Sequence, residues 1–255
     1  MTLSSSDKST AAAAPSAASD RPVPAGPIKG IVFDKDGVLF DFQGTWGAWA
    51  HRMIGALAEG DDALAQTLAD ALAYDRPTRS FRPESFVIAG PAHHISEALA
   101  VHLPHRSLTD IHEYLVTEAA NTPLAPAVPL RTTLSALKAK GFRLGVATND
   151  AERAARAQLA SQDALDLFDM VNGFDSGYGA KPDPGMCLAF AEATGLAPET
   201  LVMVGDSTHD IDAGRAAGFT CVAVLTGVAT EADLAPHADI VLPDIAALED
   251  WLESL

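Results

Sequence analysis

The stretch IKGIVFDKDGVLF, residues 28–40, decides the fold class of this chain. Its first six residues are mainly apolar and β-branched, and they stop at the polar run Asp34-Lys35-Asp36-Gly37. A short run that is apolar on both faces is typical of a central strand in a parallel sheet covered by helices. Two aspartates therefore follow the carboxyl end of a predicted strand, which is where open α/β sheets bind their ligands.

Similar apolar runs recur along the chain and alternate with amphipathic helical stretches. This alternation predicts an α/β fold with a doubly wound parallel sheet. The other predicted strands are 142–148, 201–205, 220–225 and 240–242, and the helical stretches between them include 130–140, 151–161 and 184–194.

One long interval interrupts the alternation. Between about residues 42 and 121 no strand-like run occurs, whereas apolar residues such as Trp46, Trp49 and Met53 recur at helical spacing. Ser107 and the residues after it resemble a capping box at the start of another helix. The interval is too long for an ordinary connection. We therefore predict a core formed by residues 28–41 and 122–255, with an α-helical cap domain, residues 42–121, inserted after the first strand.

Charge and composition restrict the classes of partner. The chain has 17 Lys and Arg against 34 Asp and Glu, a formal net charge of −17. Such a surface repels phosphate backbones and anionic lipids, so we expect neither nucleic acid nor a membrane as a partner. Cys187 and Cys221 match no metal or redox spacing, which favours reduced thiols in a cytoplasmic protein. Residues 1–27, rich in Ala, Ser and Pro, are predicted to be a disordered tail.

Four aspartates follow two of the predicted strands. Asp34 and Asp36 follow the first, and Asp206 and Asp210 follow the strand at 201–205. Each pair alone has an ordinary explanation, because Asp is common in turns and Asp206 could cap a helix. Capping does not explain why both pairs end strands that a parallel sheet can place side by side. Such a cluster of carboxylates needs a hard cation, and its oxygen ligands suit Mg²⁺.

Three further residues could complete a phosphate site. Thr148 ends the strand at 142–148 and, with Asn149, offers a hydroxyl and amide donors. Lys181 lies in a turn before a helix that Asp183 could cap. A lysine is a compact positive charge that suits a phosphoryl group, although a lysine before a proline can also be an ordinary surface residue.

These segments, in this order, resemble the four motifs of the haloacid dehalogenase (HAD) superfamily. The segments that carry the resemblance are DKDGVL at 34–39, the run that closes on Thr148, Lys181-Pro182, and GDSTHD at 205–210. GRAAGF (214–219) and ADIVLPDIAALEDWL (238–252) resemble the phosphoglycolate phosphatase-like branch, which carries a helical cap between its first and second motifs. The likeness extends from about residue 28 to the C-terminus.

The resemblance implies a role for each residue. Asp34 would be the nucleophile that forms an aspartyl-phosphate. Asp36 would be the general acid for the leaving alcohol and then the base that activates water. Lys35, where an apolar residue is more usual, is expected to point away from the site. The Mg²⁺ would be held by Asp34, Asp206 and the backbone carbonyl of Asp36, with support from Asp210; the phosphoryl group would be held by Thr148, Lys181 and the amide of Asn149.

Two weaker signals lie in the predicted cap. Arg79 and Arg82 belong to a basic cluster that is either a solvated loop or a reader of a substrate carboxylate or second phosphate. His93 and His94 are adjacent, so they lie on different sides of a helix, and a zinc site there is disfavoured.

The predicted function is Mg²⁺-dependent hydrolysis of a small phosphate monoester, such as 2-phosphoglycolate or a sugar phosphate, by a cytoplasmic monomer or homodimer. One alternative is a β-phosphoglucomutase-like mutase, which uses the same residues but returns the phosphoryl group to its substrate. Another is a phospho-acceptor signalling domain, which also combines an acceptor Asp with Thr and Lys but has no inserted cap. The residues FDFQGTW at 40–46 differ from the Asp-Ser or Asp-Thr pair common in the branch, and they leave the substrate open.

Overall fold

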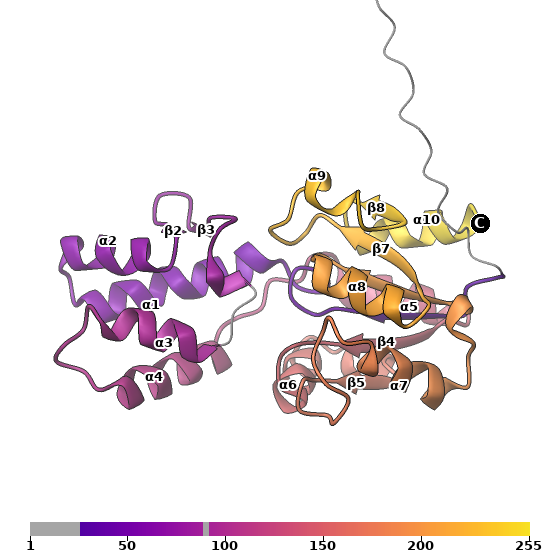
Figure 1. The fold of residues 1–255 in the computed structure, drawn as a ribbon, viewed down its shortest axis with the longest axis horizontal. Coiled ribbons are helices and arrows are strands. Elements are labelled where there is room, and N and C mark those ends of the chain that lie inside the picture. Colours follow the sequence, from indigo (N-terminus) through magenta and orange to yellow (C-terminus); the bar gives the residue numbers. More distant parts are fainter. Residues whose placement is uncertain (1–25, 89–91) are drawn as a thin grey trace, which may run out of the picture.

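The computed structural model describes residues 26–88 and 92–255. Figure 1 shows two bodies beside each other, an α/β core and a smaller, mainly helical body that follows the first strand in the chain. The prediction of a disordered tail falls on residues 1–27, of which 1–25 lie outside the described part. Among the described residues, no helix is long and apolar enough to cross a membrane.

The core contains a six-stranded parallel sheet with the strand order β5-β4-β1-β6-β7-β8. Phe33, the last residue of β1, lies in register with Val146 of β4 and Val204 of β6. The three strands followed by the predicted site residues therefore end together at one edge of the sheet. The strand bounds are β1 Gly30–Phe33, β4 Arg143–Ala147, β5 Met170–Asn172, β6 Leu201–Gly205, β7 Thr220–Val224 and β8 Ile240–Leu242.

Helices cover both faces of this sheet, because successive residues of a buried strand point to opposite faces. Ile31 and Phe33 pack with Leu134 in one apolar cluster, whereas Val32 packs in a second cluster with Phe190. The prediction of a doubly wound α/β core is confirmed. The helices of the core are α5 Leu130–Ala139, α6 Glu152–Ser161, α7 Gly185–Thr194, α8 Thr208–Ala216, α9 Glu231–Leu234 and α10 Leu248–Glu253, with short 3₁₀ turns at Leu165–Leu167, Pro198–Thr200 and Ile245–Ala247.

The smaller body has its own apolar core, which includes Trp49, Met53, Leu68, Leu99 and Ile111. A separate core suits an inserted unit, and we propose that residues 42–121 form a cap domain. Its elements are a π-helical turn Gln43–Gly47, α1 Ala48–Ala58, α2 Asp62–Ala71, β2 Tyr74–Asp75, β3 Ser80–Phe81, a 3₁₀ turn Phe86–Ile88, α3 Ala92–Ala100 and α4 Leu108–Ala120.

Short elements account for the differences from the predicted secondary structure. The interval 42–121 is not wholly free of strands, because β2 and β3 form an antiparallel pair in which Tyr74 lies opposite Phe81. The edge strand β5 was not predicted either. The three missed strands have the sequences YD, SF and MVN, so none of them is an apolar run like the equally short β8, which is IVL. Helix α7 begins after Pro184 with no side-chain cap, so Asp183 does not cap it. The predicted cap at Ser107 is confirmed, since its side chain accepts a hydrogen bond from Asp110 N.

Candidate active site

The end of β1 places two aspartates at the edge of the sheet. Asp34 N donates to the carbonyl of Val204 in β6 at 2.9 Å, so residue 34 still follows the register of the sheet. The chain then turns, and the carbonyl of Lys35 accepts hydrogen bonds from the amides of Leu39 and Phe40. Gly37 has a φ of +82°, a conformation that glycine adopts at little cost.

Asp34, Asp206 and Asp210 bring their carboxylates together. One oxygen of each lies within 4.8 Å of the others. Asp206 and Asp210 are buried, with 7% and 1% of their surfaces exposed. A side chain at Gly37 or Gly227 would collide with the Asp206 carboxylate, so these two glycines leave the space that Asp206 occupies.

Asp210 also organises the start of α8. Its Oδ2 accepts hydrogen bonds from the amides of Asp206 (3.2 Å) and Ser207 (3.1 Å) and from Ser207 Oγ (2.7 Å). Ser207 is the N-cap residue of this helix and forms a capping box with Asp210. The alternative explanation of Asp206 as a helix cap is therefore wrong, and its carboxylate is directed into the cluster instead.

Lys181 joins the carboxylates of β1 and α8. Its Nζ lies 2.6 Å from Asp34 Oδ1 and 2.6 Å from Asp210 Oδ1, and only 6% of the residue is exposed. Burial favours the neutral amine, but the charges of Asp210 and Asp34 outweigh it and hold the pKa of Lys181 above its usual range. Lys181 is therefore a fixed positive charge beside the predicted nucleophile.

The cluster still has more negative than positive charge. Burial raises the pKa of Asp34 to about 7, although Lys181 opposes this shift. Burial and the neighbouring Asp210 also raise the pKa of Asp206 well above its ordinary value. Buried carboxylates that repel one another become stable as anions when a cation lies between them. The donor atoms are all oxygens, so the set fits a hard divalent ion such as Mg²⁺.

Thr148 and Asn149, at the end of β4, have side chains with different partners. Thr148 is buried, and its hydroxyl accepts a hydrogen bond from Asp150 N at 3.1 Å, which leaves the hydroxyl proton free to be donated. The Asn149 side chain binds the backbone of Lys181, through Lys181 N to Oδ1 (2.9 Å) and Nδ2 to Lys181 O (3.0 Å). The side chain of Asn149 thus positions the lysine, and its backbone amide is the group that could bind phosphate.

Asp36 lies beside the carboxylate cluster and has different partners. Its Oδ1 accepts a hydrogen bond from Trp46 Nε1 at 3.0 Å, and its Oδ2 lies 2.5 Å from Lys35 Nζ. The prediction that Lys35 points away from the site is wrong. Its side chain is completely buried, and it also pairs with Asp150 at 3.0 Å.

Two of these partners were not identified as site residues from the sequence. Asp150 comes two residues after Thr148, and a lysine inside the first motif was a signal that a second acid should lie nearby. The helical spacing of Trp46 indicates packing in the cap, and its place just after the first motif also allows it to line the entrance; neither signal predicts the bond from its indole to Asp36.

The two cap arginines differ in their surroundings. The Arg82 guanidinium lies 3.4 Å from Asp70 and 3.9 Å from Glu84, both in the cap. Arg79 has a φ of +56°, and its carbonyl lies where a side chain at residue 47 would be. Burial and the nearby Arg79 lower the pKa of His51 in α1. Arg82 is therefore paired on the cap surface, and Arg79 lies near the first helix of the cap.

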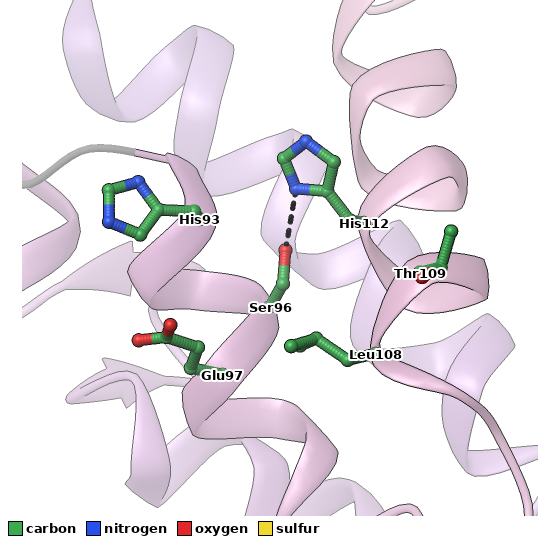
Figure 2. Close-up of a pocket in the computed structure, with 6 residues that line it drawn as sticks. All are labelled: His93, Ser96, Glu97, Leu108, Thr109 and His112. Carbon is green, nitrogen blue, oxygen red and sulfur yellow. Dashed lines mark hydrogen bonds between the residues drawn. The ribbon is translucent and has the colours of Figure 1, made fainter.

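A hollow of about 240 Å³ lies elsewhere in the cap, between α3 and α4. Figure 2 shows Ser96 directed towards His112, and Ser96 Oγ lies 3.0 Å from His112 Nδ1. The ring centroids of His93 and His94 are 4.3 Å apart. This hollow contains none of the clustered carboxylates. Its lining residues are His93, Ser96, Glu97, Leu108, Thr109 and His112.

The chain belongs to the haloacid dehalogenase-like hydrolase family, whose model matches residues 28–218. It is a HAD-type phosphoric monoester hydrolase. The chain is 33% identical over 238 residues to a phosphoglycolate phosphatase of Rhodospirillum rubrum, an alignment that covers 88% of this chain and 90% of that protein. The resemblance to this superfamily and to its phosphoglycolate phosphatase-like branch is confirmed.

Solved structures share the fold. A candidate β-phosphoglucomutase from Thermotoga maritima has a TM-score of 0.70 at 21% identity, over 89% of this chain and all of that one. A HAD family hydrolase from Deinococcus radiodurans, solved with bound phosphate and sodium, has a TM-score of 0.66 at 20% identity, over 89% of this chain and 96% of that one.

Proposed function

We propose that this hydrolase is a Mg²⁺-dependent phosphatase of small phosphate monoesters that works through an aspartyl-phosphate on Asp34. The supporting observation is the contact of Asp34 with Lys181 inside a buried cluster of carboxylates. A carboxylate nucleophile needs placement and charge neutralisation rather than a base. The fixed ammonium of Lys181 meets part of that need, since it attracts both the nucleophile and an anionic phosphoryl group.

In the first step, a carboxylate oxygen of Asp34 attacks phosphorus. A bond forms between this oxygen and phosphorus, and the bond from phosphorus to the ester oxygen breaks. Thr148 and the amide of Asn149 hold the phosphoryl oxygens together with Lys181. Positioning and charge stabilisation of this kind provide most of the catalysis in phosphoryl transfer.

Asp36 transfers protons in both halves of the reaction. It gives a proton to the departing ester oxygen, and it later takes a proton from the water that attacks the aspartyl-phosphate. In this second step the water oxygen bonds to phosphorus and the bond from phosphorus to the Asp34 oxygen breaks. Inorganic phosphate leaves, Asp34 is restored, and the proton taken from water returns Asp36 to its acid form. Asp36 suits this role because its carboxylate is partly exposed and lies next to the buried cluster without belonging to it.

The residues that would hold Mg²⁺ are Asp34, Asp206 and the backbone carbonyl of Asp36, with Asp210 in support. Bound Mg²⁺ supplies positive charge that lets two anions, carboxylate and phosphate, approach each other. The direction of the Asp36 side chain, towards Lys35 and Trp46, agrees with a metal contact through its backbone rather than its carboxylate.

The proposed substrate is 2-phosphoglycolate or a sugar phosphate of similar size. The relative from Rhodospirillum rubrum is named as a phosphoglycolate phosphatase, which supports the first choice. A substrate carboxylate would need a cation from the cap, and Arg79 is the better of the two candidates because Arg82 already has acidic partners.

The test is release of inorganic phosphate from a panel of small phosphate esters, with Mg²⁺ or with a chelator. We expect release that needs the metal and that Asp34→Asn abolishes. The ranking of 2-phosphoglycolate against sugar phosphates identifies the substrate class. Isomerised sugar phosphate without free phosphate would instead support the mutase, and no reaction with any ester would contradict the proposed function.

A further inference from the structure

Lys35 is a buried cation in the middle of the first motif. Its side chain has no exposed surface, and its ammonium lies between the carboxylates of Asp36 and Asp150. The ring of Phe40 lies below it, with its centroid 5.9 Å from Nζ. Two carboxylates, at 2.5 and 3.0 Å, thus compensate the charge of this buried ammonium.

Stability does not explain this lysine. Taking a cation out of water is costly, and replacing both partners of a buried ion pair by apolar side chains is often neutral or stabilising, whereas removing one partner is costly when the other stays buried. Asp36 and Asp150 are partly exposed, with 20% and 43% of their side chains accessible, so they could remain hydrated without it. An apolar residue beside Phe40 would therefore satisfy the packing, and what the lysine adds is a charge at a fixed point.

That charge acts on the Asp36 carboxylate, which is held from two sides. Lys35 binds Oδ2, and the indole of Trp46 binds Oδ1. Trp46 is itself fixed by edge-to-face packing on Trp49, with ring centroids 5.9 Å apart. Two partners on two oxygens leave the carboxylate little freedom to rotate, and charge-assisted bonds of this kind are the stronger ones.

The second partner of Lys35 ties this arrangement to the phosphate-binding strand end. The carboxylate of Asp150 forms an ion pair with Lys35, and the backbone amide of Asp150 donates a hydrogen bond to Thr148 Oγ1. Lys35 therefore connects the residue that transfers protons with the loop that holds the phosphoryl group. Such a connection keeps the distance between the two groups constant, which proton transfer to the ester oxygen requires.

We propose that Lys35 is a positioning residue that fixes the Asp36 carboxylate for proton transfer to the leaving oxygen. This inference rests on the proposed function, since it gives Asp36 the role of general acid. In this mechanism Lys35 transfers no proton and forms no bond, and its ion pairs are with Asp36 and Asp150 rather than with the nucleophile Asp34. Its contribution is the orientation of Asp36, with Trp46 as the second contact.

The experiment compares leaving groups in the Lys35→Met variant of the full chain. An alkyl phosphate leaves as a poor alkoxide and needs the proton from Asp36, whereas p-nitrophenyl phosphate leaves as a stable phenolate and needs it much less. The ratio kcat/KM reports the first step, in which the ester bond breaks. We expect Lys35→Met to lower kcat/KM for the best alkyl ester about 10- to 100-fold, and to lower it clearly less for p-nitrophenyl phosphate.

A double-mutant cycle separates positioning from a general structural role. If Lys35 acts through Asp36, then adding Lys35→Met to Asp36→Asn changes the alkyl-ester kcat/KM by less than about 2-fold. Lys140→Met is the matched control, because Lys140 pairs with Glu249 on the surface near the C-terminus and should leave both esters unaffected. Trp46→Phe removes the other contact and should change the leaving-group ratio in the same direction, even if Lys35→Met fails to fold.

The outcomes distinguish the two proposals. Equal losses for both esters, or a full loss from Lys35→Met in the Asp36→Asn background, would overturn the role of Lys35 and leave the phosphatase mechanism intact. An Asp34→Asn variant that still hydrolyses both esters would contradict the mechanism itself.

Discussion

The side-chain amide of Asn149 forms two hydrogen bonds with the backbone of Lys181, one to its amide at 2.9 Å and one to its carbonyl at 3.0 Å. Thirty-two positions separate the two residues along the chain. The paired bonds fix the loop that carries Lys181 against the end of β4, and so they determine where its ammonium meets Asp34. A residue that follows Thr148 thereby controls the geometry of a residue in another motif.

Replacing Asn149 by Ala should therefore weaken catalysis through Lys181. We expect kcat/KM for the best substrate to fall about 10-fold or more, because a small displacement of a positioned group is costly in rate. Steady-state kinetics check this. Asn121→Ala is the control, since Asn121 also donates a side-chain hydrogen bond, to the carbonyl of Thr117, but lies at the exposed end of α4. Equal kinetics for the two variants would contradict the role given to Asn149.

The sequence predicted the strands that position the site because each is a continuous apolar run. The run at 201–205 matches β6 to the residue, the runs at 28–33 and 142–148 contain β1 and β4, and their common edge follows from their parallel order. The hairpin β2–β3 has only two residues in each strand. The hairpin is stabilised by tertiary packing, for example between the rings of Tyr74 and Phe81, whose centroids are 5.2 Å apart. A local sequence pattern does not predict such packing.

Side-chain direction in the site was harder to predict than its composition. A two-residue period from Asp34 to Asp36 correctly predicts two acids at one strand end, but it assigns Lys35 to the far side. The chain turns at Lys35, and the carbonyl of this residue accepts bonds from Leu39 and Phe40, so the strand period no longer applies. The partner of Lys35, Asp150, comes from another strand end, and only the sheet order brings the two together.

The raised pKa of Asp34 predicts how the metal-free protein responds to pH. The pKa of this carboxyl is 3.8 when it is free in water, as in the unfolded chain, and burial raises the pKa to about 7 in the folded protein. Between these values the folded state retains a proton that the unfolded state has released, so the free energy of unfolding falls as pH rises through this range. The stabilisation is complete below the lower value and lost above the higher one. Asp206 shifts in the same direction and adds to the effect.

We therefore expect the Tm in a chelator to be lower at about pH 8 than at about pH 5, and the Tm gain from Mg²⁺ to be larger at the higher pH, where the carboxylates are ionised. Thermal unfolding over this range measures both. Asp34→Asn removes one titrating group and should flatten the dependence. A Tm that rises with pH in the chelator would contradict the assignment.

The two cap arginines should differ in their effect on substrate choice. Arg79→Ala should raise KM for 2-phosphoglycolate more than for an ester without a carboxylate, about 10-fold if a charged hydrogen bond is lost. Arg82→Ala removes only exposed pairs with Asp70 and Glu84, and such pairs contribute little. It is the matched control, and we expect its substrate profile to be unchanged. If Arg79→Ala also leaves the profile unchanged, the cap does not read a carboxylate through this residue.

The glycine at position 227 should control metal affinity. A methyl group there would collide with the Asp206 carboxylate, so either this proposed metal ligand or the loop at Gly227 must shift. We expect Gly227→Ala to weaken Mg²⁺ binding, measured by calorimetry, at least about 10-fold, the lower end of the effect of disturbing groups that orient ligands. Gly55→Ala is the control, because a methyl group there meets open space in the middle of α1. It should leave metal binding unchanged and stabilise the protein by about 0.5–1 kcal/mol. Unchanged Mg²⁺ affinity in Gly227→Ala, together with normal folding, would mean that Asp206 does not bind the metal in the position seen here.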